Sequence, residues 1–141
     1  MLGAVLGDVI GSVYEFRNAK TKEFPLITPQ TRYTDDSVMT LAVAKWLLED
    51  QNHTESGLVN CMQSVGRRHI YAGYGSKFRS WLLSDDPCPY NSWGNGAAMR
   101  VSPVGLYAKS IEEALELARI TACVTHDHPE GIKGARAVIS T

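Results

Sequence analysis

The chain has 141 residues, of which 44% are hydrophobic and 21% are charged, and its formal net charge is −1. Chains of this length can bury roughly two-thirds of their unfolded surface around one core, so we expect a single domain over residues 1–141. The nearly neutral charge and the absence of a basic run argue against a nucleic-acid-binding surface.

The cysteines and the apolar N-terminal stretch bear on the compartment. Cys61, Cys88 and Cys123 are widely spaced and form no CxxC pair, which predicts reduced thiols in a cytoplasmic protein. The stretch from Leu2 to Val13 is interrupted by Asp8, follows no basic segment and is too short to cross a bilayer. We therefore expect neither a signal peptide nor a membrane partner.

The chain opens with a predicted helix in which Gly3, Gly7 and Gly11 recur at a spacing of four. Each glycine costs about 1 kcal/mol of helix propensity relative to alanine, so we expect close packing or a ligand to compensate. Asp8 and Glu15 share one face if this helix is continuous, roughly 10 Å apart along its axis. For either carboxylate alone, a solvated surface is the ordinary interpretation.

A loop and four polar residues precede the second predicted helix. Residues 17–33 contain two prolines and few apolar side chains, which predicts a surface loop of a length that functional lids often have. The next four residues, Thr34 to Ser37, all carry side-chain oxygens and stand before an apolar run that predicts a buried helix ending near Asp50. These oxygens are therefore expected at a helix N-terminus.

Two interpretations of Thr34, Asp35 and Asp36 are open. Such residues commonly cap helices, because they accept hydrogen bonds from the free N–H groups of the first turn and because acidic groups favour the helix dipole. Hard oxygen ligands also suit Mg²⁺, Mn²⁺ or Ca²⁺, and adjacent carboxylates at a helix edge can point towards two ions. Nothing in the local sequence decides between a cap and a metal site.

The remaining helices are predicted from caps and apolar spacing. They are a helix capped by Thr54 and ending at Arg67–His69, a short amphipathic piece over Phe78–Leu82, a core helix from the capping box Ser110–Glu113 to Thr125, and a helix from Pro129 to Thr141. No window shows sustained period-two alternation, so the fold is expected to be all-α.

The segment Asn91–Arg100 reads NSWGNGAAMR. Glycines that flank an asparagine before small helix formers describe a loop whose backbone can approach a ligand, with free N–H groups at a helix start. The segment is neither a Walker loop nor a dinucleotide fingerprint, and an ordinary turn explains it equally well. For His126, a role at a helix end is the ordinary interpretation, because zinc sites need three or four ligands.

Taken together, these segments resemble the ADP-ribosylglycohydrolase family, which includes the dinitrogenase-reductase-activating glycohydrolase. The resemblance is carried, in order along nearly the whole chain, by GDVIGSVYE at 7–15, TDDS at 34–37, YNSWGNGAAMR at 90–100, and His126 before Pro129 and Gly134. It implies a compact orthogonal helical bundle with two Mg²⁺ or Mn²⁺ ions beneath the distal ribose of an ADP-ribosyl group. The implied reaction is hydrolysis of the linkage from C1″ of that ribose to a modified protein or related conjugate.

The resemblance also implies roles for single residues. Thr34, Asp35 and Asp36 would be metal ligands, Asp35 and Asp36 would belong to the catalytic set, and Glu15 would be the catalytic acid or base near the ions. Substrate contacts would come from Tyr74 and Gly75 on the adenosine or phosphate side, from Ser92, Trp93, Gly94, Asn95 and Gly96 around the diphosphate and distal ribose, and from His126.

The sequence departs from the family pattern in one respect. Family members continue to a second acidic motif, of the Asp-x-Asp-Thr type, that supplies the remaining metal ligands, and this chain contains none. We therefore expect the chain to match the N-terminal part of the fold and to have little or no hydrolase activity alone, as a fragment, a truncated copy or a polypeptide completed by a second chain. Two alternatives are a non-catalytic ADP-ribose-binding protein of the same fold and a helical interaction domain whose Asp-Asp pair only caps a helix.

Overall fold

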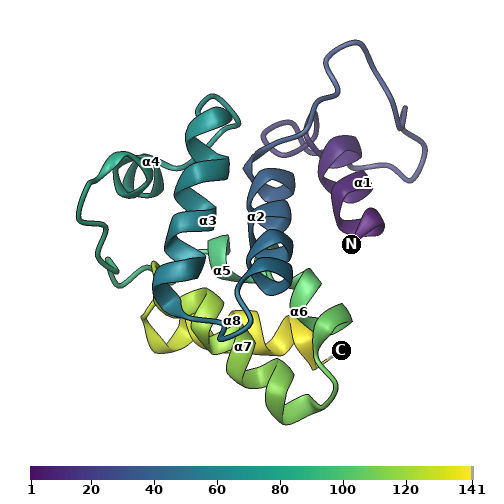
Figure 1. Ribbon diagram of the computed structural model, residues 1–141. Helices are drawn as coiled ribbons and strands as arrows, with labels where there is room; N and C mark the ends of the chain where they lie inside the picture. Colours follow the sequence, from purple (N-terminus) through teal and green to yellow (C-terminus); the bar gives the residue numbers. More distant parts are fainter. Residues whose placement is uncertain (141) are drawn as a thin grey trace.

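The computed structural model describes residues 1–140, which form eight α-helices and no strand (Figure 1). The helices are α1 (Leu2–Gly11), α2 (Asp35–Glu49), α3 (Glu55–Arg68), α4 (Ser76–Leu83), α5 (Gly96–Met99), α6 (Ser102–Tyr107), α7 (Ile111–Cys123) and α8 (Pro129–Ile139). The prediction of an all-α fold is confirmed. In this part of the chain no helix is long and apolar enough to cross a membrane.

Helices α2 and α3 lie side by side at the centre of the molecule, and α1 stands on the opposite side of α2 from α3 (Figure 1). Helices α7 and α8 lie across the lower ends of this central pair in the same view. One hydrophobic core joins helices α2 to α8, without α1. Its fully buried side chains include Met39, Val43, Trp46, Leu58, Met62, Leu82, Val101, Val104 and Ala118. Trp46 Nε1 donates a hydrogen bond to Thr54 O at 3.1 Å, which ties the end of α2 to the start of α3.

Helices α3 and α7 begin directly after the capping residues that the sequence predicts, Thr54 and Ser110. Thr54 Oγ1 accepts a hydrogen bond from Gly57 N at 3.0 Å at the start of α3, and Ser110 Oγ accepts one from Glu113 N at 3.2 Å at the start of α7. Glu113 accepts in return from Lys109 N at 2.7 Å, one residue before the cap. These bonds satisfy N–H groups that a helix start leaves free.

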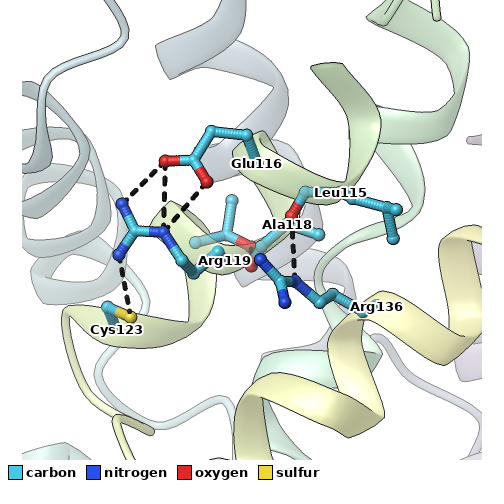
Figure 2. A network of polar contacts seen from close by, with 7 residues as sticks. Leu115, Glu116, Ala118, Arg119, Cys123 and Arg136 are labelled. Carbon is cyan, nitrogen blue, oxygen red and sulfur yellow. Dashed lines mark hydrogen bonds and ion pairs between the residues drawn. The ribbon is translucent and has the colours of Figure 1, made fainter. Parts of the chain in front are cut away.

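Polar contacts also position α8 against α7. Arg136 Nε of α8 donates to Leu115 O of α7 at 3.2 Å (Figure 2). Within α7, Arg119 donates to both carboxylate oxygens of Glu116 at 2.7–3.1 Å and to Cys123 Sγ at 3.5 Å. The ion pair is largely exposed and adds little stability.

One expectation about the first helix is wrong. Helix α1 ends at Gly11, and Glu15 N bonds back to Gly11 O in a turn, so Asp8 and Glu15 do not share one face of a continuous helix. In the described residues no close packing compensates for the glycine stripe, since a Cβ added at Gly3, Gly7 or Gly11 would meet nothing within 4 Å, and compensation by a ligand stays a prediction. The physical reason is that α1 buries none of its residues and is attached to α2 chiefly through polar contacts.

The C-terminal part differs from expectation in detail. Helix α7 ends at Cys123 rather than Thr125, and α8 ends at Ile139. The predicted continuation of the last helix to Thr141 falls in part on Thr141 itself, which lies outside the described residues. The short helices α5 and α6 follow the glycine-rich segment, and α6 had no signal in the hydrophobic pattern because two turns are too short to show a period.

Candidate functional site

Two neighbouring cavities flank the start of α2. The first, of about 340 Å³, is lined by Asp35, Gly75, Ser76, Lys77, Phe78, Tyr90, Ser92, Asn95, Gly96, Met99, Arg100 and His126. The second, of about 290 Å³, is lined by Gly7, Asp8, Gly11, Ser12, Glu15, Thr34, Asp36 and Asn95. Asn95 lines both cavities, whereas the adjacent carboxylates of Asp35 and Asp36 line one each.

Asp8 holds α1 against the N-terminus of α2. Its carboxylate accepts hydrogen bonds from Thr34 N at 2.8 Å, Thr34 Oγ1 at 2.5 Å, Ser37 N at 3.1 Å and Ser37 Oγ at 2.5 Å. Thr34 Oγ1 in turn accepts from Asp36 N at 3.3 Å, so the interpretation of Thr34 as a helix cap is confirmed. The carboxylate that completes this cap comes from another helix, which the local sequence could not indicate.

The carboxylates of Asp35 and Asp36 have no cationic partner in residues 1–140. Burial, and then the charge of Asp36, raise the pKa of Asp35 to about 6. Burial, followed by the charges of Asp8 and Glu15, raises the pKa of Asp36. Four carboxylates are therefore close enough to repel one another, and in the described residues no Lys, Arg or His forms an ion pair with Asp35 or Asp36.

The donor set suits a divalent cation in type but falls short in number. A threonine hydroxyl and carboxylates are hard oxygen ligands of the kind that Mg²⁺ and Mn²⁺ accept. However, the described residues contain no group of three or more His, Cys, Asp or Glu side chains placed to hold an ion together. Thr34, Asp35 and Asp36 could supply only part of a six-ligand shell, with water or other groups completing it.

The glycine-rich segment borders the same cavity as Asp35. Gly94 N donates to Ser92 Oγ at 3.3 Å, and Gly96 begins α5. A Cβ added at Gly96 would lie 2.8 Å from both Cε1 and Nε2 of His126, so the ring of His126 can approach this closely only because residue 96 has no side chain. The segment and His126 therefore form one wall of the cavity.

Behind that wall lies a buried arginine. Arg100 is fully buried, and its Nη2 donates to Thr121 O at 2.5 Å and to Thr125 Oγ1 at 2.7 Å. Burial lowers the pKa of Arg100 to about 10, so it carries a positive charge at neutral pH. Burial, and then the charge of Arg100, lower the pKa of His126 to about 4, which leaves the imidazole neutral.

Comparisons with known proteins show which family this chain belongs to. The sequence pattern of the ADP-ribosylglycohydrolase family matches residues 1–140. The chain belongs to the ADP-ribosylglycohydrolase family. The resemblance seen in the sequence is thus confirmed.

Curated relatives include ADP-ribosylhydrolase ARH3 from Xenopus tropicalis, which is 29% identical over 160 residues, 96% of this chain and 46% of the relative. ADP-ribosylhydrolase ARH3 from Homo sapiens is 28% identical over 165 residues, with the same coverage. The protein of that name from Bos taurus is 28% identical over 167 residues, 96% of this chain and 45% of the relative. The chain therefore spans about half the length of the curated relatives it matches.

The structure places most, but not all, of the site residues expected for an ADP-ribosylglycohydrolase around the two cavities. Those that line a cavity are Glu15, Thr34, Asp35, Asp36, Gly75, Ser92, Asn95, Gly96 and His126. Trp93 lines neither cavity and is 74% exposed. Tyr74 packs against Phe78, and its hydroxyl is buried without a hydrogen-bond partner in the described residues. Their roles in ligand binding stay predictions.

The sequence did not single out two residues of the site. The sequence assigns no role to Arg100, although this residue ends the segment 90–100 that resembles the family. For Asp8 it predicts only a carboxylate on the same helix face as Glu15. The sequence signal for Arg100 was a basic residue at the end of the Gly-Asn-Gly segment. The sequence signal for Asp8 was an acidic residue, directly after Gly7, inside an otherwise apolar stretch.

Helix α8 reaches this site through Gly131, where we expect substitution to be costly. A Cβ at Gly131 would lie 2.8 Å from Ser92 O and 2.9 Å from His126 O, which are backbone atoms that cannot rotate away. Gly131→Ala is expected to lower the free energy of unfolding by about 1–3 kcal/mol, as overpacking does. Gly134 on the same helix meets nothing within 4 Å, so Gly134→Ala is expected to be neutral or stabilising by up to about 1 kcal/mol. Urea unfolding of both variants measures this difference, and equal effects would contradict the close approach.

Proposed function

We propose that this protein binds the ADP-ribosyl group of a modified protein or related conjugate and takes part in the metal-dependent hydrolysis of its glycosidic bond. The observation that carries the proposal is the gathering of unpaired carboxylates at the start of α2, with Glu15 on the α1 side and the glycine-rich segment beside them. Family membership supports the same chemistry.

Thr34, Asp35 and Asp36 are the residues that would hold Mg²⁺ or Mn²⁺. When bound, the ion would neutralise the crowded carboxylates and stabilise charge as the glycosidic bond opens towards an oxocarbenium-like state. The raised pKa of Asp35 supports this assignment, because burial and then the charge of Asp36 disfavour the ionised carboxylate, and a bound cation would offset both.

The chain's own residues would divide the remaining work. Glu15 is exposed and lines the second cavity, so it could accept a proton from the attacking water or give one to the leaving group. Backbone N–H groups of Ser92–Gly96 other than that of Gly94, which donates to Ser92 Oγ, would bind the diphosphate, since N–H groups of a glycine-rich turn attract anions. The buried charge of Arg100 would add to the positive potential at this wall.

The proposal includes further metal ligands from outside these residues, supplied by the rest of a longer protein or by a second polypeptide. The described residues hold only part of a ligand shell, and the curated relatives are about twice as long as the region matched. We therefore expect this chain alone to bind ADP-ribose but to release little or none of it from a modified protein. Robust metal-dependent hydrolysis by the purified 141-residue chain would contradict this part of the proposal.

Calorimetric titration with ADP-ribose tests the binding step, with Mg²⁺ present or with EDTA. We expect Mg²⁺ to tighten the binding of ADP-ribose. In Mg²⁺, the Asp36→Asn variant is expected to bind ADP-ribose at least about tenfold more weakly than the wild-type chain, because one charged metal ligand is lost. Asp85→Asn is the matched control, since Asp85 is an exposed carboxylate in the loop after α4 and lines neither cavity.

The same titration separates the alternatives. Binding that is indifferent to Mg²⁺ would favour a non-catalytic ADP-ribose-binding protein. The absence of any binding would leave a helical interaction domain, and the proposed function would be wrong for this chain.

A further inference from the structure

Thr125 lies at the centre of a buried chain of hydrogen bonds between Arg100 and His126. Arg100 Nη2 donates to Thr125 Oγ1 at 2.7 Å, and the same oxygen lies 2.7 Å from His126 Nδ1. Arg100 and Thr125 are fully buried, and His126 is 5% exposed. Because water has almost no access to these side chains, the hydroxyl of Thr125 and Nδ1 of His126 depend on partners in the protein. Arg100 bonds only through Nη2, since its Nε and Nη1 have no hydrogen-bond partner in residues 1–140.

The direction of each bond follows from the donors available. A guanidinium has no acceptor, so the first bond can run only from Arg100 to Thr125. The hydroxyl of Thr125 then has a single hydrogen to place, and within residues 1–140 its only other hydrogen-bond contact is with His126 Nδ1. A buried hydroxyl hydrogen without an acceptor is unfavourable. Thr125 therefore donates to Nδ1 of His126.

An accepting Nδ1 fixes the rest of the ring. In neutral imidazole one nitrogen accepts and the other carries the proton, so the proton of His126 lies on Nε2. The Nε2 side of the ring faces the glycine-rich segment: Cβ atoms built at Gly96 and Gly94 would lie 2.8 Å and 4.0 Å from Nε2. The N–H group is thus on the side of the ring that borders the cavity.

The charged groups around the ring also favour the neutral form. Burial and the charge of Arg100 lower the pKa of His126, whereas Asp127 acts in the opposite direction and is outweighed. Tyr90 also contacts the ring: its ring centroid lies 5.8 Å from that of His126, and burial raises its pKa to about 12. Tyr90 is therefore uncharged and does not compensate for Arg100. Asp35 and Lys77 line the same cavity as His126.

We propose that Arg100 and Thr125 are positioning residues that hold His126 as the Nε2–H tautomer, so that it offers one hydrogen-bond donor to an oxygen of a ligand in the cavity beside Gly96. The ligand oxygen belongs to a phosphate or a ribose hydroxyl, and this identification rests on the proposed function. The inference that His126 carries its proton on Nε2 does not rest on the proposed function. In this state Nδ1 is occupied by Thr125 and Nε2 carries a proton, so His126 acts as a donor and not as a metal ligand.

Nitrogen-15 NMR of histidine-labelled protein tests the tautomer directly. In the wild-type chain at neutral pH we expect the His126 signals of a protonated Nε2 and an unprotonated Nδ1. Thr125→Val removes the hydroxyl and keeps the shape of the side chain, and it is expected to give a mixture of tautomers. Thr125→Ser retains the hydroxyl and is expected to give the wild-type pattern.

Calorimetry with ADP-ribose then tests the consequence for binding. Affinity is expected to fall roughly tenfold in Thr125→Val, the loss that corresponds to one misdirected hydrogen bond, and to stay near wild type in Thr125→Ser. A wild-type His126 with its proton on Nδ1, or charged at neutral pH, would overturn the inference even if Thr125→Val did not fold. An unchanged tautomer in a folded Thr125→Val would overturn it too. If the wild-type chain binds no ADP-ribose, the proposed function fails while the NMR result still decides the tautomer.

Discussion

Asp8→Ala is expected to detach α1 from the rest of the protein and to lower the free energy of unfolding by about 2–4 kcal/mol. The variant removes a carboxylate that accepts four hydrogen bonds from Thr34 and Ser37. A hydrogen bond to a charged group contributes about 1.5–3 kcal/mol net of exchange with water, and four bonds that share one carboxylate are not additive. The effect is large because α1 has no fully buried residue, and its apolar side chains are at most part-buried. Loss of α1 also removes Glu15 from its place beside Asp35 and Asp36.

Urea unfolding and amide hydrogen exchange measure both consequences. For Asp8→Ala we expect a lower urea midpoint and fast amide hydrogen exchange over residues 2–11, whereas the amides of α7 stay protected from exchange. Ser12→Ala is the matched control, since it removes a hydroxyl that accepts from Arg32 N at 3.2 Å and donates to Val9 O at 2.9 Å but leaves the four bonds of Asp8 in place. An Asp8→Ala protein with the wild-type midpoint and protected α1 amides would show that other contacts hold this helix.

Asp35→Asn is expected to stabilise the metal-free protein at pH 7 while abolishing the effect of Mg²⁺ on ligand binding. The pKa of Asp35 is raised to about 6 from 3.8, so the native state keeps a proton that the unfolded chain has already released. Native stability therefore falls as the pH rises from about 4 through about 6. At about 1.4 kcal/mol per pKa unit, the whole shift corresponds to a gain of about 3 kcal/mol in the free energy of unfolding at pH 7. Solvent screens the charges at this part-exposed site, so we expect a gain of about 1–2 kcal/mol.

The pH dependence distinguishes this effect from a general improvement in packing. In EDTA, the gain in unfolding free energy from Asp35→Asn should be present at pH 7 and should shrink towards zero near pH 4, where the wild-type carboxyl is protonated. Mg²⁺ should raise the stability of the wild-type protein and leave that of Asp35→Asn unchanged. The exposed-site variant Asp85→Asn should show neither response, and a gain from Asp35→Asn that is equal at both pH values would contradict the electrostatic explanation.

Local sequence signals predicted the elements that local chemistry determines. The start of α2 at Thr34 and those of α3 and α7 at Thr54 and Ser110 follow from side chains that cap the next turn, which is a contact within four residues. The apolar spacing after Asp36 is sufficient for the buried helix at the centre of the fold.

The parts of the site that the sequence missed depend on contacts across the fold. Asp8 bonds to residues 26 and 29 positions away, and Arg100 bonds to Thr125 over 25 positions. No helical period relates such residues, so only the packed arrangement of α1 on α2 and of α5 on α7 and α8 brings them together. The wrong expectation of one continuous face from Asp8 to Glu15 has the same origin, because the spacing alone did not reveal that α1 stops at Gly11.

The central claim is that the carboxylates at the start of α2 and the glycine-rich segment belong to one site for ADP-ribose and a divalent cation. Amide NMR spectra recorded while Mn²⁺ is added in the presence of ADP-ribose test it most directly, because the paramagnetic ion broadens the signals of nearby residues. The account predicts that residues 34–37 broaden first, that ADP-ribose shifts the signals of Gly94–Gly96, and that α7 amides away from the site stay sharp. Broadening centred on Asp85 and Asp86, or ADP-ribose shifts that leave Gly94–Gly96 unchanged, would contradict it.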